Sequence, residues 1–309
     1  MTAEAWWRDF TFERGAVRVR KTGALVPVSA GVAGEVLAWL RFYLAVEAAG
    51  ASRRADGPKI WFAPDRPRPW YLVWAAGKLA GLRTVADPAE ANLGFYFDDA
   101  TSGAAPEHIG ARMINAGCTD VSKSRVAAVF EAVTGRTLAV DPASFDGPMA
   151  VKSETNGVHD GRVVAGPAAA EPGLVYQRLI DNLAGDGLVE DLRCPTVAGD
   201  VPVVFLKRRP LAERFANHNS QVRMLDPGAV FSAEERGLIA DFCAAMGLEW
   251  GGLDVLRDRS DGALWIVDVN KTDMGPPTAL PLADKMAATR RIAASLRAYA
   301  EKIASGDRS

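Results

Sequence analysis

The sequence contains the stretch Gly251-Gly252-Leu253-Asp254-Val255-Leu256-Arg257 and, after a polar turn, Leu264-Trp265-Ile266-Val267-Asp268-Val269-Asn270. Strongly apolar residues recur through both halves, and the turn at 258–262 consists of Asp, Arg, Ser and Gly residues. This pattern is typical of an antiparallel hairpin, and it predicts strands at 252–257 and 263–270. The hairpin decides the interpretation of the chain, because it gathers acidic side chains on one face of a sheet.

Three oxygen-bearing side chains share one face of the predicted hairpin. Residues two apart in a strand point the same way, so Asp268 and Asn270 lie together. With the turn centred near Ser260, Asp254 falls opposite Asp268. Mg²⁺ prefers carboxylate and carbonyl oxygens, so the sequence predicts a Mg²⁺ site at Asp254, Asp268 and Asn270. The alternative is that Asp268 and Asn270 only end a strand at a polar edge.

Further strand candidates precede the hairpin, and most of them alternate polar residues along one face. They span 149–152, 174–180, 188–195 and 201–208. Arg193 and Lys207 lie on the last two, and their charge is opposite to that of Asp254 and Asp268. The combination predicts a metal–phosphate ligand between the two sets across a cleft. The alternative is ordinary surface ion pairing, which contributes little to stability.

Two lysines lie where an anion can bind. Lys152 ends an apolar strand and leads into the glycine-containing loop 153–161, whose backbone N–H groups can cover phosphate oxygens. Lys123 lies at the opening of a helix predicted over 122–134, where its ammonium can assist a bound anion. The alternative for both lysines is plain solvation, with Ser122 serving only as the helix cap.

Composition divides the chain into three segments. A polar Gly-Pro linker at 52–58 is followed by alternating elements typical of α/β units: strands at 59–62, 83–85, 93–97 and 113–115, and a helix at 69–82. Later helices are predicted at 232–247 and 282–303. The predicted domains are therefore a Trp-rich extension (1–58), a small α/β domain (59–118) and a third domain (119–309) that ends in a helix.

Tryptophan is concentrated at the start of the chain. Six of the eight tryptophans fall in the first quarter: Trp6, Trp7, Trp39, Trp61, Trp70 and Trp74. One interpretation is a packing core between the N-terminal segment, with its helix at 36–49, and the next domain. The other is an aromatic docking surface for a protein partner or a sugar.

Composition also excludes several classes of function. The 309 residues carry 36 basic and 38 acidic side chains, a net charge of -2 that argues against a nucleic-acid partner. Neither a secretory signal nor a bilayer-length apolar segment is visible, so we expect a cytoplasmic protein without a membrane partner. The separated Cys118, Cys194 and Cys243 indicate no disulfide framework. The three histidines lack metal-ligand spacing, and the common nucleophile, dinucleotide and P-loop motifs are absent.

Taken in order, these segments resemble the ATP-grasp superfamily of carboxylate–amine ligases. The resemblance covers about residues 59–290. It rests on Asp120-Val121-Ser122-Lys123-Ser124, Val151-Lys152 with its loop, 175–180, Asp191-Leu192-Arg193, and Asp254 with Asp268-Val269-Asn270. It implies an α+β or α/β structure, with an ATP-grasp fold after a small α/β domain of the pre-ATP-grasp kind.

The resemblance also implies a role for each site residue. Lys123 and Lys152 would hold ATP phosphates, Arg193 would face the transferred phosphate with Lys207 beside it, and Asp268, Asn270 and Asp254 would bind Mg²⁺. The adenine would meet the backbone of the hinge strand, and Asp181 would meet the ribose; the hinge residues are Gln177, Arg178, Leu179 and Ile180. Lys271, in a polar segment where the family is usually apolar, would meet an anionic acceptor.

The implied activity is that of a Mg²⁺–ATP-dependent ligase. It would activate a small-molecule or peptide carboxylate as an acylphosphate, which an amine or similar nucleophile then attacks. The alternatives on the same fold are a phosphotransferase acting on a hydroxyl and a non-catalytic nucleotide-binding scaffold subunit. No motif specifies the acceptor or the oligomeric state.

Overall fold

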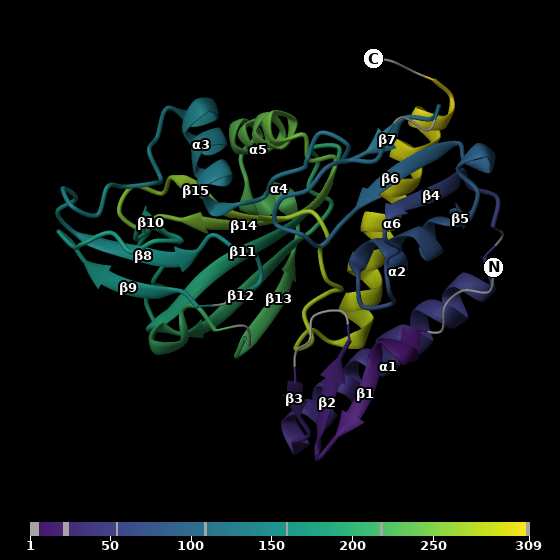
Figure 1. Cartoon of the computed structure of the whole chain (residues 1–309), viewed down its shortest axis with the longest axis horizontal. Helices are drawn as coiled ribbons and strands as arrows, with labels where there is room; N and C mark the ends of the chain where they lie inside the picture. The colour runs from purple at the N-terminus through teal and green to yellow at the C-terminus, as the bar shows by residue number, and fades with distance from the viewer. Residues whose placement is uncertain are drawn as a thin grey trace.

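The computed structural model describes residues 6–20, 25–53, 55–107, 110–158, 160–216 and 219–306. It consists of an N-terminal unit, a parallel-sheet domain and a larger part with two antiparallel sheets (Figure 1). His108, His159 and His218 lie outside the described residues. The mixed helix-and-sheet class predicted from the sequence is confirmed.

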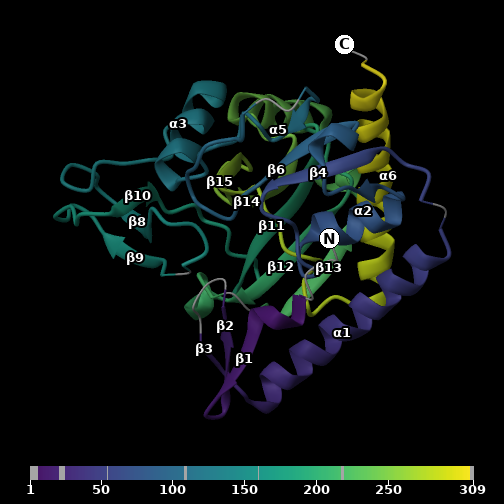
Figure 2. The same ribbon diagram turned by 45° about the vertical axis from the view of Figure 1, so that its right-hand side comes forward.

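The N-terminal unit combines a small antiparallel sheet with one long helix. Its elements are η1 (Trp6–Asp9), β1 (Phe10–Glu13), β2 (Ala16–Val19), β3 (Leu25–Pro27) and α1 (Ala30–Ala51). The Ser29 hydroxyl caps α1 by accepting a hydrogen bond from the Val32 N–H. The sequence predicted only the helix, because strands of three or four residues are too short to show a period-two pattern. Figure 2 shows the unit below β12 (Val204–Pro210), β13 (Gln221–Leu225) and α6 (Leu282–Ala304).

Aromatic rings hold the N-terminal unit against its neighbours. The Tyr43 ring stacks between Trp39 and Trp74, with ring centroids 5.5 Å apart on each side. Trp6 meets Trp39 edge-on at 5.3 Å. These contacts confirm the packing interpretation for these rings. The Trp7 side chain is 63% exposed, and docking of a protein partner on it stays a prediction.

The second domain is a parallel sheet in the order β5-β4-β6-β7. Its elements are β4 (Lys59–Pro64), α2 (Leu72–Ala80), β5 (Arg83–Thr84), η2 (Pro88–Glu90), β6 (Leu93–Phe97) and β7 (Met113–Ile114). The last helix of the chain, α6 (Leu282–Ala304), returns to this domain and packs on α2, so that Ile292 and Leu296 share a core with Ile60 and Phe95. The sequence predicts this helix as the end of the third domain.

The largest part contains two antiparallel sheets. One has the order β10-β8-β9: β8 (Pro148–Ser153), β9 (Arg162–Ala165) and β10 (Leu174–Arg178). The other has the order β13-β12-β11-β14-β15: β11 (Leu188–Val197), β12 (Val204–Pro210), β13 (Gln221–Leu225), β14 (Trp250–Arg257) and β15 (Leu264–Asn270). The helical elements of this part are α3 (Lys123–Thr134), η3 (Leu211–Glu213), α4 (Pro227–Val230) and α5 (Ala233–Met246). α3 and α5 contact each other, and α3 packs on β15.

The hairpin of β14 and β15 has the predicted register. Asp254 pairs with Asp268 and Gly252 with Asn270, and a bulge follows Asp254. The helix predicted at 232–247 is α5, and a capping box between Ser232 and Glu235 begins it. The sequence missed β9 and β13, whose short runs of mixed polarity carry little periodic signal.

Candidate functional site

One cavity of about 1240 Å³ collects the predicted site residues. It is bounded by the β10-β8-β9 sheet, the five-stranded sheet, the start of α3, the segment that leads to α6, and α1. The predicted residues in its lining are Lys123, Lys152, Gln177, Arg178, Leu179, Ile180, Arg193, Lys207, Asp254, Asp268 and Asn270. Asp181 is exposed and does not belong to the lining.

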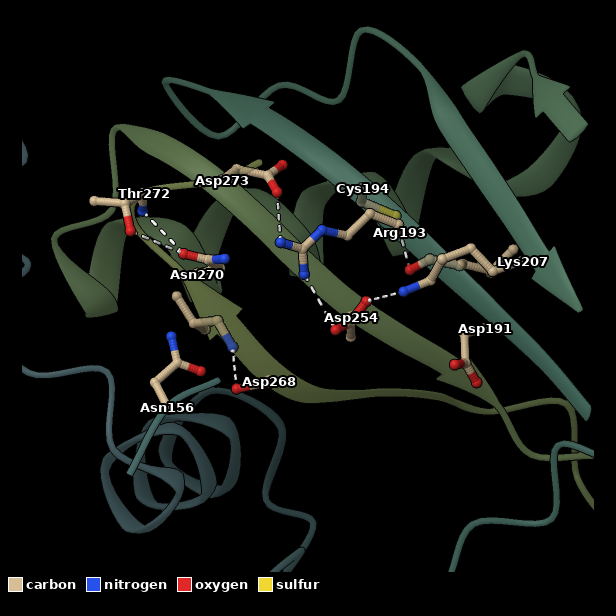
Figure 3. A network of polar contacts seen from close by, with 12 residues as sticks. Asn156, Asp191, Arg193, Cys194, Lys207, Asp254, Asp268, Asn270, Thr272 and Asp273 are labelled. Carbon is tan, nitrogen blue, oxygen red and sulfur yellow. Dashed lines mark hydrogen bonds and ion pairs between the residues drawn. The ribbon is translucent and has the colours of Figure 1, made fainter. Parts of the chain in front are cut away.

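A row of alternating charges crosses the five-stranded sheet (Figure 3). Arg193 on β11 lies directly opposite Asp254 on β14, with 3.1 Å between Nη1 and Oδ2. Lys207 on β12 donates to the other Asp254 oxygen at 3.0 Å. The second amino group of Arg193 donates to Asp273 Oδ1 at 2.6 Å. The acids and bases therefore pair on one sheet face, which corrects the expectation that they face each other across a cleft.

The neighbours of these charges shift their protonation equilibria. Burial alone would raise the pKa of Asp254, but Lys207 and Arg193 outweigh it and hold that pKa well below its usual range. Burial acts against the Arg193 guanidinium, yet Asp273 and Asp254 raise its pKa further. Asp254 and Arg193 are therefore both charged at neutral pH.

The two predicted phosphate lysines reach the same cavity from different elements. Lys123, in the first turn of α3, is 5% exposed and donates to Asp268 Oδ1 at 2.7 Å and to Asn156 Oδ1 at 3.1 Å. Lys152 on β8 donates to Gln177 Oε1 at 3.1 Å. Desolvation lowers the pKa of Lys152, with Asp268 partly opposing the shift. An anionic ligand beside Lys152 would favour its charged form.

The loop after Lys152 folds back over the start of α3. The Glu154 carboxylate accepts a hydrogen bond from the Ser124 N–H at 3.1 Å, so an anionic group occupies the helix N-terminus. The Asn156 N–H donates to the Thr101 hydroxyl at 2.9 Å, which connects the loop to the parallel-sheet domain. The loop thus covers Lys123 with side chains of its own.

Comparison with known proteins gives similarity in structure only. No family model and no curated protein matches the sequence. The ATP-grasp ligase PsnB, solved with a minimal precursor, aligns over 78% of this chain and 99% of its own, with a TM-score of 0.47 and 11% identity. An ATP-grasp RimK domain protein from Sphaerobacter thermophilus aligns over 79% and 99%, with a TM-score of 0.48 and 12% identity. D-alanine–D-alanine ligase from Bacillus anthracis, solved with ATP, aligns over 82% and 100%, with a TM-score of 0.44 and 10% identity.

The printed names of PsnB and of the RimK domain protein include ATP-grasp, the superfamily that the sequence resembles. At these identities the likeness concerns the course of the chain and says nothing of substrate. The chemistry that the cavity supports follows from its own side chains.

The strand predicted as the hinge uses two of its backbone N–H groups within the protein. The N–H of Arg178 donates to Leu138 O at 2.9 Å, and that of Leu179 donates to Pro148 O at 3.1 Å. Gln177 is 1% exposed, and its Nε2 has no hydrogen-bond partner among the described residues. A donor buried beside a cavity without a partner fits a ligand that carries an acceptor atom there.

The predicted metal ligands supply the right kind of donor atom but already have protein partners. Asp254 is ion-paired with Arg193 and Lys207, Asp268 is paired with Lys123, and Asn270 Oδ1 accepts from the Thr272 N–H at 3.0 Å. In the described part of the chain, no group of three His, Cys, Asp or Glu side chains is close enough to hold a metal ion. Mg²⁺ binding here would need the site's own oxygens together with phosphate and water oxygens.

Sequence reasoning chose the wrong residue in the polar segment after β15. Lys271 is 1% exposed and does not line the cavity; its ammonium lies 4.9 Å from the centroid of the Tyr96 ring. Asp273 lines the cavity instead and is 4% exposed. A side chain at Gly252 would clash with the Asp273 carboxylate, so a glycine is needed for this close approach. Asp273 is recognised as a site residue only by its contact with Arg193, because no local sequence motif marks it.

Among the described residues, no helix is long and apolar enough to cross a membrane.

Proposed function

We propose that the protein is a Mg²⁺–ATP-dependent ligase that joins a carboxylate to an amine through an acylphosphate. The observation that carries the proposal is the convergence of Lys123, Lys152 and Arg193 with Asp254, Asp268 and Asn270 on one cavity. The cations suit the oxygens of a triphosphate, and the carboxylate and amide oxygens suit a divalent cation. The ATP-grasp resemblance of the sequence assigns these residues the same roles.

ATP would enter with its base near the hinge strand. The buried Nε2 of Gln177 has no hydrogen-bond partner among the described residues, which suits an acceptor atom of adenine. Lys123 and Lys152 would exchange Asp268, Asn156 and Gln177 for phosphate oxygens. Asp254, Asp268 and Asn270 would hold Mg²⁺, which when bound neutralises charge on the phosphate oxygens.

The reaction proceeds in two transfers. A carboxylate oxygen of the first substrate attacks the γ-phosphorus of ATP, and the bond to the bridging oxygen breaks with its electron pair leaving on ADP. The amine then attacks the acyl carbon; the C–O bond to phosphate breaks, and the amine loses a proton. The Arg193 guanidinium, held between Asp254 and Asp273, lies where it can stabilise charge on the transferred group, with Lys207 beside it.

Calorimetry of Mg²⁺–ATP binding tests the first half of the proposal. Wild type should bind, and Lys152→Ala should bind at least tenfold more weakly. Lys302→Ala, at an exposed position on α6, is the matched control and should bind like wild type. Absence of binding to wild type would refute the proposal.

Product analysis tests the second half. Wild type is incubated with Mg²⁺–ATP and a panel of carboxylates and amines, and ADP, phosphate and ligated product are measured. Ligated product with ADP and phosphate supports the ligase. A phosphorylated acceptor without ligation would identify a phosphotransferase, and ATP binding without turnover would identify a scaffold.

A further inference from the structure

The cavity has an apolar end that the proposed ATP site does not use. The lining there includes Gly34, Ala38, Trp39 and Phe42 of α1. We call them the α1 wall. Trp70 and Met274 line the same end, and Met274 is 52% exposed although its side chain is apolar. The Trp-rich segment, which the ATP-grasp resemblance does not cover, therefore forms part of the cavity.

The cavity has room for a second molecule beside a nucleotide. Sites for one small ligand typically occupy about 300–1,000 Å³. The present volume of about 1240 Å³ exceeds that range. The charged row leads directly to the apolar end. Asp273, which accepts a hydrogen bond from Arg193, is followed in the chain by Met274 and Gly275. A Cβ added at Gly275 would lie 3.8 Å from the Phe42 ring.

Neither packing nor backbone conformation explains the glycines on this side of α1. A Cβ added at Gly34 would meet nothing within 4 Å, and one at Gly31 would meet only the Ser29 hydroxyl at 3.9 Å. Neither residue is among those with positive φ. Each glycine in a helix costs about 0.5–1 kcal/mol relative to alanine. What the glycines provide is open space on the cavity side, since both line it.

Two carboxyl groups lie along the same part of the lining. Asp273 is 4% exposed, with one oxygen bound to Arg193 and the other without a donor among the described residues. Glu35 adds a second carboxylate from α1, and it is exposed. A buried carboxylate oxygen without a donor is costly, and an N–H group of a ligand would satisfy it.

We infer that the α1 wall and Asp273 form the subsite for the amine substrate, and that this substrate is an amino acid or peptide with an apolar or aromatic side chain. The inference rests on the proposed ligase function, because that function requires an amine substrate beside the transferred phosphate. The apolar side chain lies against Trp39, Phe42 and Met274. The amino group lies toward Asp273, next to Arg193 and the transferred phosphate.

The test uses two dipeptides of the same backbone as probes, without nucleotide. Binding of L-phenylalanyl-L-phenylalanine and L-aspartyl-L-aspartate to the full chain is measured by calorimetry. We expect the first to bind and the second to bind at least tenfold more weakly. Gly34→Leu, which fills the open space, should weaken binding of the first probe at least tenfold. Gly237→Leu, an exposed helical glycine of α5 with nothing within 4 Å of an added Cβ, is the matched control and should bind like wild type.

A second variant guards against a folding artefact. Met274→Glu places a charge at the apolar end and should also weaken the phenylalanine probe, while thermal unfolding of all variants is recorded. Equal binding of the two dipeptides, or unchanged binding in a folded Gly34→Leu protein, would overturn the inference. Mg²⁺–ATP binding is measured in parallel. If wild type binds no Mg²⁺–ATP but still prefers the phenylalanine dipeptide, the ligase proposal is refuted and the inference of an apolar subsite stands.

Discussion

Two sheets face the same cavity, but they differ in the core that supports them. The five-stranded sheet carries Arg193 and Asp254 and packs on α3 and α5, with Leu253, Val255 and Val269 fully buried beneath it. Within the described residues, the buried core of the β10-β8-β9 sheet consists of Met149, Val151 and Tyr176. Groups that need fixed geometry thus lie on the well-packed sheet, and Lys152 with its covering loop lies on the weakly supported one. Local stability follows buried apolar contact, so the smaller sheet should open first.

The largest effect on stability is expected at the row of alternating charges on the five-stranded sheet. Asp254→Ala removes the carboxylate that neutralises Lys207 and Arg193, and it should lower the free energy of unfolding by about 3 kcal/mol, because buried partners lose their counter-charge. Urea denaturation measures the change. Asp241→Ala, at an exposed position on α5, is the control and should change stability by less than about 0.5 kcal/mol. Equal effects of the two substitutions would contradict this assignment.

The same carboxylate predicts the direction of a pH effect. Lys207 and Arg193 outweigh burial and hold the pKa of Asp254 below its unfolded value of 3.8. Its stabilising contribution is therefore fully present above that value and is lost as pH falls toward the folded-state pKa. The stability difference between wild type and Asp254→Asn should shrink between pH 6 and pH 3. A difference that grows on acidification would show that the shift has the opposite sign.

A smaller effect, on binding, is expected from the weakly supported sheet. Lys152→Met keeps the apolar stem and removes the charge, and it should cost about 1.5–3 kcal/mol of ATP affinity. Because desolvation lowers the pKa of Lys152, wild-type affinity should fall as pH rises through that lowered pKa. Calorimetry across a pH series should show this fall in wild type and not in Lys152→Met. The same fall in both proteins would assign it to another group.

The smallest effect is expected in local opening. Hydrogen exchange should be faster at β8 and β10 than at β11 and β14, because the smaller sheet buries few apolar side chains. Mg²⁺–ATP should slow exchange in β8 and its loop and leave β14 nearly unchanged. Uniform slowing of both sheets would remove the distinction between them.

Much of the fold follows from local pattern. The hairpin register, the capping box and the helix stop at Gly135 each depend on residues within a few positions of one another. Short strands such as β9 and β13 escaped prediction because four or five residues of mixed polarity do not establish a period. In the site, Lys123, Lys152 and Arg193 line one cavity, and the roles that the resemblance implies for them stay predictions.

The sequence by itself determined which residue types occur in which order, and hence the elements and the faces of the strands. The tertiary structure alone decided which side chains meet. It placed Asp181 outside the cavity, put Asp273 rather than Lys271 on the site, and brought the Trp-rich segment to the apolar end. The reason is physical: periodicity and capping act over a few residues, whereas Arg193 and Asp273 are 80 positions apart and meet only when the sheets and α6 have packed.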